Sequence, residues 1–309
     1  MVKTSLGWLV LCVGTLPLTV PMTVTAADVV TLENVQEPAA NRKEEPKATA
    51  FSLERAVHFL DSAAVDWQKQ RKCFTCHTNY AFLYARPAIS AENETHRTVR
   101  QYAEELVRDR WPDKGPRWDA EVVATAAALA FNDAATTKKL HPVTKQALDK
   151  MWTLQRPDGG WDWLKCDWPP MESDDHYGAT LAAIAVGVAP EDYARTPAAQ
   201  AGLAKLVEYL KANPAPTVHH QAMQLWASVY VEQLLGKDER EKKEQREKMI
   251  ATIWSLQRAD GGWNLASLGN WQRGDKSPQD TESSDGYATG FLTYVLRIDR
   301  KSTRLNSSH

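Results

Sequence analysis

The segment Cys73-Phe74-Thr75-Cys76-His77 has the spacing at which proteins attach haem covalently. In a C-x-x-C-H motif the two thiols bond to the haem vinyl groups, and the histidine ligates the iron. The sequence therefore predicts one c-type haem held by Cys73, Cys76 and His77. Two alternatives stay open: a disulfide between the two cysteines, and a small metal site that includes Cys166. The candidates for a second axial ligand are His219, His220, Met223 and Met171.

A second group that could do chemistry is the run of carboxylates in Glu172-Ser173-Asp174-Asp175. Clustered carboxylates raise one another's pKa, so one of them can stay protonated in a dry cavity and act as a general acid. The alternative is structural, because Ser and Asp side chains also cap the N-termini of helices. Glu282-Ser283-Ser284-Asp285 occurs at the corresponding place of a second copy, which favours capping.

These copies belong to an internal repeat, in which residues 154–161, LQRPDGGW, return as residues 256–263, LQRADGGW. Each copy ends an amphipathic run, over residues 146–155 and 249–257, and then breaks at Asp-Gly-Gly, where glycine permits unusual backbone angles. A loop, an acidic or Ser cap and a helix of small residues follow. The repeating unit is thus predicted to be a hairpin of an outer and an inner helix.

The Gln-x-x-x-x-x-Trp pattern at the end of each outer helix resembles the QW repeat of the squalene-hopene cyclase and prenyltransferase superfamily. The resemblance covers about residues 51–298 and implies an all-α fold, an α/α toroid. It also implies a ligand of apolar or polyprenyl type. Because the acidic run resembles the D-x-D-D motif of the cyclases, Asp174 would be the proton donor, with Asp175 and Glu172 beside it.

Aromatic residues recur around both repeats. In a cyclase such rings stabilise a carbocation through their π-faces, whereas the Gly-Gly-Trp residues are structural staples. The loop aromatics could equally line a sugar or a flat cofactor. The residues predicted to line a ligand are Trp163, Trp168, Tyr177, Trp271 and Tyr287.

Helical periodicity dominates from residue 51 onward and predicts five hairpins. The expected pairs are 52–70 with 80–86, 98–110 with 120–131, 146–155 with the helix from Thr180, 199–211 with 218–235, and 249–257 with 287–298. A stripe of Leu203, Leu206, Val207 and Leu210 indicates an outer helix with one buried face. The resemblance to the superfamily implies a toroid of six hairpins, whereas only five are predicted here. We therefore expect the natural gene to continue past Ile298.

The ends of the chain have a different character. Residues 1–27 have the basic start, short apolar core and small-residue cleavage site of a signal peptide, so the protein is expected to be periplasmic or secreted. The alternative is a membrane anchor. Residues 28–50 are predicted to be a flexible linker. Residues 299–309 resemble a translated sequencing adapter and are left out of the predicted fold.

Composition excludes one class of partner. The chain has 37 Lys and Arg against 39 Asp and Glu, without a basic stripe, so we expect no nucleic-acid binding. The charged run Lys237–Lys248 is expected to be a solvated helix start.

Three functions follow as expectations. The first is an exported toroid that binds an apolar or isoprenoid molecule and carries one c-type haem, with a redox partner and peripheral membrane contact. The second is a cyclase, an isomerase or lyase that uses Asp174 as acid. The third is a cofactor-free periplasmic interaction module.

Overall fold

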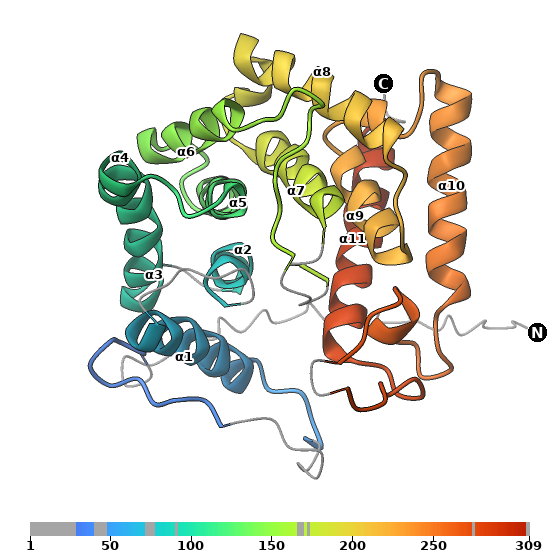
Figure 1. The fold of residues 1–309 in the computed structure, drawn as a ribbon. Helices are drawn as coiled ribbons and strands as arrows, with labels where there is room; N and C mark the ends of the chain where they lie inside the picture. Colours follow the sequence, from blue (N-terminus) through green and yellow to red (C-terminus); the bar gives the residue numbers. More distant parts are fainter. Residues whose placement is uncertain are drawn as a thin grey trace, which may run out of the picture.

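We describe a computed structural model over residues 29–39, 48–71, 78–89, 92–165, 170–171, 174–273 and 276–306, with 301–306 as backbone only. The regular structure of these residues is helical, and no strand occurs among them (Figure 1), which confirms the all-α prediction. The helices are α1 (Leu53–Arg71), α2 (Asn79–Ile89), α3 (Glu94–Glu105), α4 (Trp111–Lys114), α5 (Asp119–Ala135), α6 (Pro142–Thr153), α7 (Asp175–Val188), α8 (Pro197–Ala212), α9 (Val218–Ser228), α10 (Glu239–Ser255) and α11 (Gly286–Asn306).

The helices form an inner row and an outer row. Helices α2, α5, α7, α9 and α11 contact one another in that order, while α1, α3, α6, α8 and α10 lie outside them (Figure 1). The sequence pattern pairs each outer helix with the inner helix that follows it. The structure instead packs α6 most closely on α5, α8 on α7 and α10 on α9, the inner helices that precede them.

The two repeats fold into the same turn. Gln155 donates to the Gly159 carbonyl at 2.9 Å, and Gln257 donates to the Gly261 carbonyl at 2.8 Å. Both glycines have positive φ, 97° and 84°, which residues with a Cβ rarely adopt. The indole N–H of Trp161 donates to the Met151 carbonyl, as that of Trp263 does to the Ile253 carbonyl. The tryptophans therefore hold each turn against the last turn of its outer helix.

Small residues bring the inner helices close together. The runs 123–128 of α5 and 180–185 of α7 are buried throughout. Gly178 of α7 lies so close to the Trp163 ring that an added Cβ would meet its Cε3 atom at 2.3 Å. On the outer helix α8 the predicted stripe from Leu203 to Leu210 is buried, whereas most of the charged start of α10 is exposed.

Residues of neighbouring inner helices contact each other near the helix starts. Tyr80 of α2 lies with its hydroxyl 3.1 Å from the Thr125 hydroxyl of α5. The His176 ring of α7 packs edge-on against His220 of α9. Further along the row, His219 of α9 meets Tyr287 of α11. The N-terminal ends of α7, α9 and α11 therefore lie together.

Two segments depart from the expected boundaries. Residues 29–39, expected as part of a flexible linker, pack on the domain: Val30 is 4% exposed, and its carbonyl accepts the Thr95 hydroxyl at 2.6 Å. Asp299, assigned to the adapter-like tail, is buried in α11 and pairs with Arg246 of α10 at 2.5 Å. The predicted signal peptide lies outside the described residues. None of the helices that could be searched is long and apolar enough to span a bilayer.

Candidate functional site

Some of the predicted site residues fall outside the part of the chain that the structure describes. These are Cys73, Cys76, His77, Glu172 and Trp168. The others lie near the N-terminal ends of α7, α9 and α11, in the loops beside them, or one turn into these helices.

Asp174 is the N-cap of α7. Its Oδ1 accepts the backbone N–H of Tyr177 at 3.0 Å, as the capping interpretation predicts. Its Oδ2 lies 2.8 Å from Nε2 of His220 on α9, a close ion-pair contact rather than a well-aligned hydrogen bond. The Asp174 side chain is 34% exposed and that of His220 only 1%. The carboxyl group thus faces the surface with an imidazole behind it.

Thr217, the N-cap of α9, orients the His220 ring. Its hydroxyl accepts the His220 backbone N–H and lies 2.7 Å from the ring Nδ1. A hydroxyl that accepts the backbone N–H can use its own hydrogen as a donor to Nδ1. This arrangement favours the tautomer with the proton on Nε2, facing Asp174.

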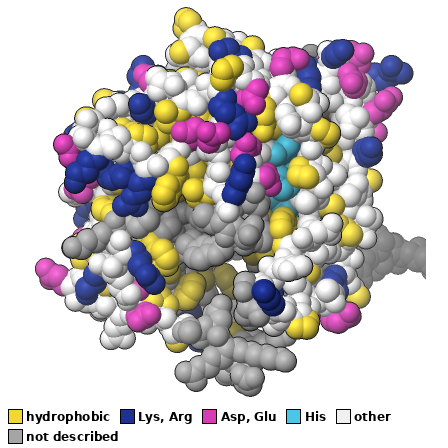
Figure 2. Space-filling model, viewed as in Figure 1, with side chains coloured by type: hydrophobic (Ala, Val, Ile, Leu, Met, Phe, Trp, Pro, Cys, Tyr) yellow, Lys and Arg dark blue, Asp and Glu magenta, His cyan; other side chains and the backbone are white. Residues whose placement is uncertain are grey.

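Two further histidines beside this pair are buried. His176 is 5% exposed, and neither of its ring nitrogens has a hydrogen-bond partner among the described residues. Burial, followed by the charge of His220, lowers the pKa of His176 to about 4, against the opposing effect of Asp174. Burial likewise lowers the pKa of His219 to about 3. Both rings are therefore neutral at pH 7. Figure 2 shows histidine side chains in the region where Figure 1 has α9.

Aromatic side chains surround His219. Its Nε2 lies 2.8 Å from the Tyr287 hydroxyl, and its ring stacks on Phe291 with centroids 4.8 Å apart. Tyr177 stacks on it from α7, and Trp271 meets it edge-on. The structure therefore brings together three of the residues predicted to line a ligand, from three separate segments.

Trp163, the fourth of the described ligand-lining residues, lies behind this group. Its ring is 5.8 Å from that of Tyr177, and its indole N–H donates to the Met171 carbonyl at 2.7 Å. The side chain is buried, so Trp163 supports Tyr177 rather than presenting a surface of its own.

A second aromatic group continues from the first along the inner helices. Trp226 of α9 contacts Phe131 of α5 at 5.6 Å between centroids and Tyr294 of α11 at 5.1 Å. Tyr84 of α2 packs on Phe131 in turn. These residues were not predicted, although the spacing of Tyr287, Phe291 and Tyr294 in the sequence is that of one helix face.

Asp175 has a different role from its neighbour Asp174. Its carboxylate pairs with Arg156 at 2.7 Å and accepts the backbone N–H of Trp163 at 3.2 Å. Both partners belong to the Gly-Gly-Trp turn or follow it directly. Asp175 therefore fastens this turn to α7, and its contacts lie away from the histidines.

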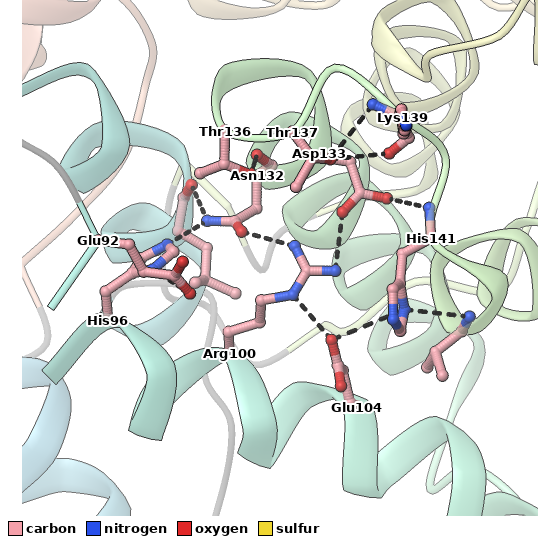
Figure 3. Close-up of polar contacts among 12 residues, drawn as sticks. Glu92, His96, Arg100, Glu104, Asn132, Asp133, Thr136, Thr137, Lys139 and His141 are labelled. Atoms are coloured by element: carbon pink, nitrogen blue, oxygen red, sulfur yellow. Dashed lines mark hydrogen bonds and ion pairs between the residues drawn. The ribbon is translucent and has the colours of Figure 1, made fainter. Parts of the chain in front are cut away.

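A polar cluster elsewhere (Figure 3) borders a surface pocket of about 400 Å³. Arg100 of α3 binds Glu104, Asn132 and Asp133 at 2.6–2.8 Å, and Asn132 lies 2.7 Å from the His96 ring. The guanidinium and the residues around it are thus engaged with each other, and they join α3 to the C-terminal end of α5.

Among the described residues no group of three or more His, Cys, Asp or Glu side chains is arranged to hold a metal ion. Comparison of the chain with protein-family models, curated proteins and solved structures gave no match.

Proposed function

We propose that this chain is an exported α/α toroid, similar in fold to the squalene-hopene cyclases, that binds an apolar, polyprenyl-type molecule against its inner helices. The row of successively contacting inner helices, the outer helices around it and the two Gly-Gly-Trp turns with matching hydrogen bonds support the toroid. Export rests on the sequence of residues 1–27.

One observation carries the binding function: aromatic rings of α11 remain partly open to solvent although α11 belongs to the inner row. Tyr287 is 37% exposed and Tyr294 41%, and Phe291 between them is partly buried. Adjoining exposed apolar rings on a soluble domain mark a place where a ligand or partner binds. Covering such a surface with an apolar molecule yields ~25 cal/mol per Å² removed from water.

The test is the binding of the fluorescent apolar probe N-phenyl-1-naphthylamine and its displacement by farnesol. Phe291→Ala removes a ring whose burial is worth about 1.5–3 kcal/mol, so affinity should fall about tenfold or more. Phe59→Ala removes an exposed ring of α1 and should leave binding unchanged. Equal affinity of both variants and the wild type would reject this surface as the binding site.

The second candidate function, a c-type cytochrome, has support from the motif and from His176. Cys73, Cys76 and His77 would hold the haem, which would supply one-electron chemistry. His176 fits the role of second axial ligand because both its ring nitrogens lack partners in the described structure, whereas His219 and His220 contact Tyr287 and Asp174.

The haem proposal is tested by expression in a host that matures c-type cytochromes. A haem spectrum that survives acid-acetone extraction is expected, and Cys73→Ser with Cys76→Ser should abolish it. His176→Ala should then change the spin state of the iron without loss of bound haem. A colourless wild-type protein would favour the disulfide instead.

A further inference from the structure

We propose that a surface pocket lined by residues of α8, α9 and α10 binds an anionic sugar, a polyhydroxylated ring that carries one carboxylate or phosphate group. These three helices are neighbours in Figure 1, and the pocket has a volume of about 480 Å³. Sites for small molecules have volumes of about 300–1,000 Å³. The pocket is formed by other side chains than the aromatic surface of α11, so this site does not depend on the function proposed above.

One face of α10 forms a wall of the pocket. Glu241, Gln245 and Lys248 line it, and their spacing of i, i+4 and i+7 puts them on the same side of the helix. Lys243 is not among the lining residues and forms an exposed pair with Glu247. The charged start of α10, which the sequence alone presents as a solvated helix, thus has one stripe that belongs to a pocket.

Glutamine amides are the commonest polar groups of the pocket. The glutamines that line it are Gln221, Gln224, Gln233 and Gln245. Gln224 donates to the Leu234 carbonyl at 2.8 Å and so holds the turn of residues 232–236 on α9. The other three side-chain amides make no hydrogen bond within the described residues. An amide offers both donors and an acceptor, as a sugar hydroxyl does, so these groups are complementary to a ligand with several hydroxyls.

Lysines give the pocket a surplus of positive charge. Lys237 and Lys248 line it and form no ion pair in the part of the chain that the structure describes, whereas Lys211 pairs with Glu208 at 2.8 Å. Glu241 supplies the one carboxylate among the described lining residues, and it accepts the backbone N–H of Lys237 at 2.7 Å. Two ammonium groups beside unbonded amides favour a ligand that is anionic as well as hydroxylated.

The buried residues of the lining are apolar. They are Leu210, Leu234, Leu235 and Met249. Apolar side chains of this kind can cover the C–H face of a sugar ring while the polar groups fix its orientation. No aromatic side chain is among the described residues of the pocket, which disfavours a nucleotide, since bases usually stack on aromatic rings.

Isothermal titration calorimetry with D-glucuronate, glucose 6-phosphate, D-glucose and acetate tests the proposal. Wild-type protein should bind at least one of the two anionic sugars about tenfold more tightly than glucose, which lacks the charge, and than acetate, which lacks the hydroxyls. The tighter of the two sugars identifies the anionic group. Lys237→Gln/Lys248→Gln should weaken that sugar several-fold and reduce the salt dependence of its binding.

Two further variants complete the experiment. Gln221→Leu removes an amide from α9 and should also weaken the anionic sugar, with the salt dependence kept. Lys243→Gln makes the same lysine change outside the pocket and is the matched control, with wild-type affinity expected. Circular dichroism shows that each variant is folded.

The outcomes separate this site from the aromatic surface. Failure of both anionic sugars to bind overturns the proposal, and so does equal affinity for glucose or acetate. An equal loss in Lys243→Gln and in the double lysine variant also overturns it, because the lysines would then act only through the overall charge. Binding of N-phenyl-1-naphthylamine should be unchanged in the double lysine variant, so each proposal can fail without the other.

Discussion

Nε2 of His220 lies 2.8 Å from Oδ2 of Asp174, so the first residues of α7 and α9 are joined by a carboxylate and an imidazole. The same carboxylate caps α7 through its other oxygen. One side chain thus holds a helix end and at the same time meets the imidazole of a neighbouring helix.

Substitution of Asp174 separates these roles. Asp174→Ala should destabilise the protein by about 1 kcal/mol through loss of the cap, and Asp174→Asn by much less. If the chain is a cyclase that uses Asp174 as acid, Asp174→Asn should also abolish conversion of squalene, followed by gas chromatography. Absence of any cyclised product with the wild-type protein would reject the cyclase proposal for that substrate.

Stability should fall with acid because buried histidines must stay neutral in the fold. The pKa of His176 is about 4 in the folded protein against 6.5 for an ordinary histidine, so the unfolded chain binds more protons between these values. The contribution of His176 to the free energy of unfolding is therefore at its maximum above pH 6.5 and is lost as the pH falls toward 4. The difference corresponds to about 3 kcal/mol for His176 alone.

Urea unfolding at a series of pH values measures this loss. His176→Phe should flatten the slope between pH 6.5 and 4, whereas His58→Gln, at an exposed position of α1, should keep the wild-type slope. An unchanged slope in His176→Phe would contradict the assignment of the effect to this residue.

Local patterns predicted the helices and the repeated turns. The bonds from Gln155 to Gly159 and from Gln257 to Gly261 span four residues each, so the sequence of one turn determines them. The burial of Leu203 and Leu206 follows from helical periodicity in the same way. Such features need no knowledge of neighbouring helices.

The contacts between helices could not be predicted in this way. His176 and His220 meet only because the fold brings the N-terminal ends of α7 and α9 together. That α6 packs on α5, the helix before it, depends on how all the helices are arranged and not on the sequence of α6 alone. The packing of Val30 could not be predicted either, since the short segment around it shows no periodicity. Its place depends on a distant partner, Thr95 of α3.

The buried pair of Arg100 and Asp133 in Figure 3 should be important for stability. Asp133 is 1% exposed, and Arg100→Leu leaves its charge without the guanidinium. Removing one partner of a buried ion pair costs about 3–5 kcal/mol. Arg108→Leu, which breaks an exposed pair with Asp109, is the matched control and should unfold at the wild-type urea concentration.

The double variant Arg100→Leu/Asp133→Leu completes this test. Because it leaves no unpaired charge, its loss of stability should be smaller than the sum of the two single variants. Additive losses would show that the two side chains act independently of each other.

The two repeats offer a matched pair of glycine substitutions, at Gly159 and Gly261. Both have positive φ, so alanine should cost about 1 kcal/mol or more in either turn. A Cβ at Gly159 would also meet the Lys205 carbonyl oxygen of α8 at 2.2 Å, whereas nothing lies within 4 Å of one at Gly261. Backbone atoms of a packed helix cannot move aside as a flexible side chain does. Gly159→Ala should therefore lower the melting temperature clearly more than Gly261→Ala, and equal losses would show that α8 does not press on the first turn.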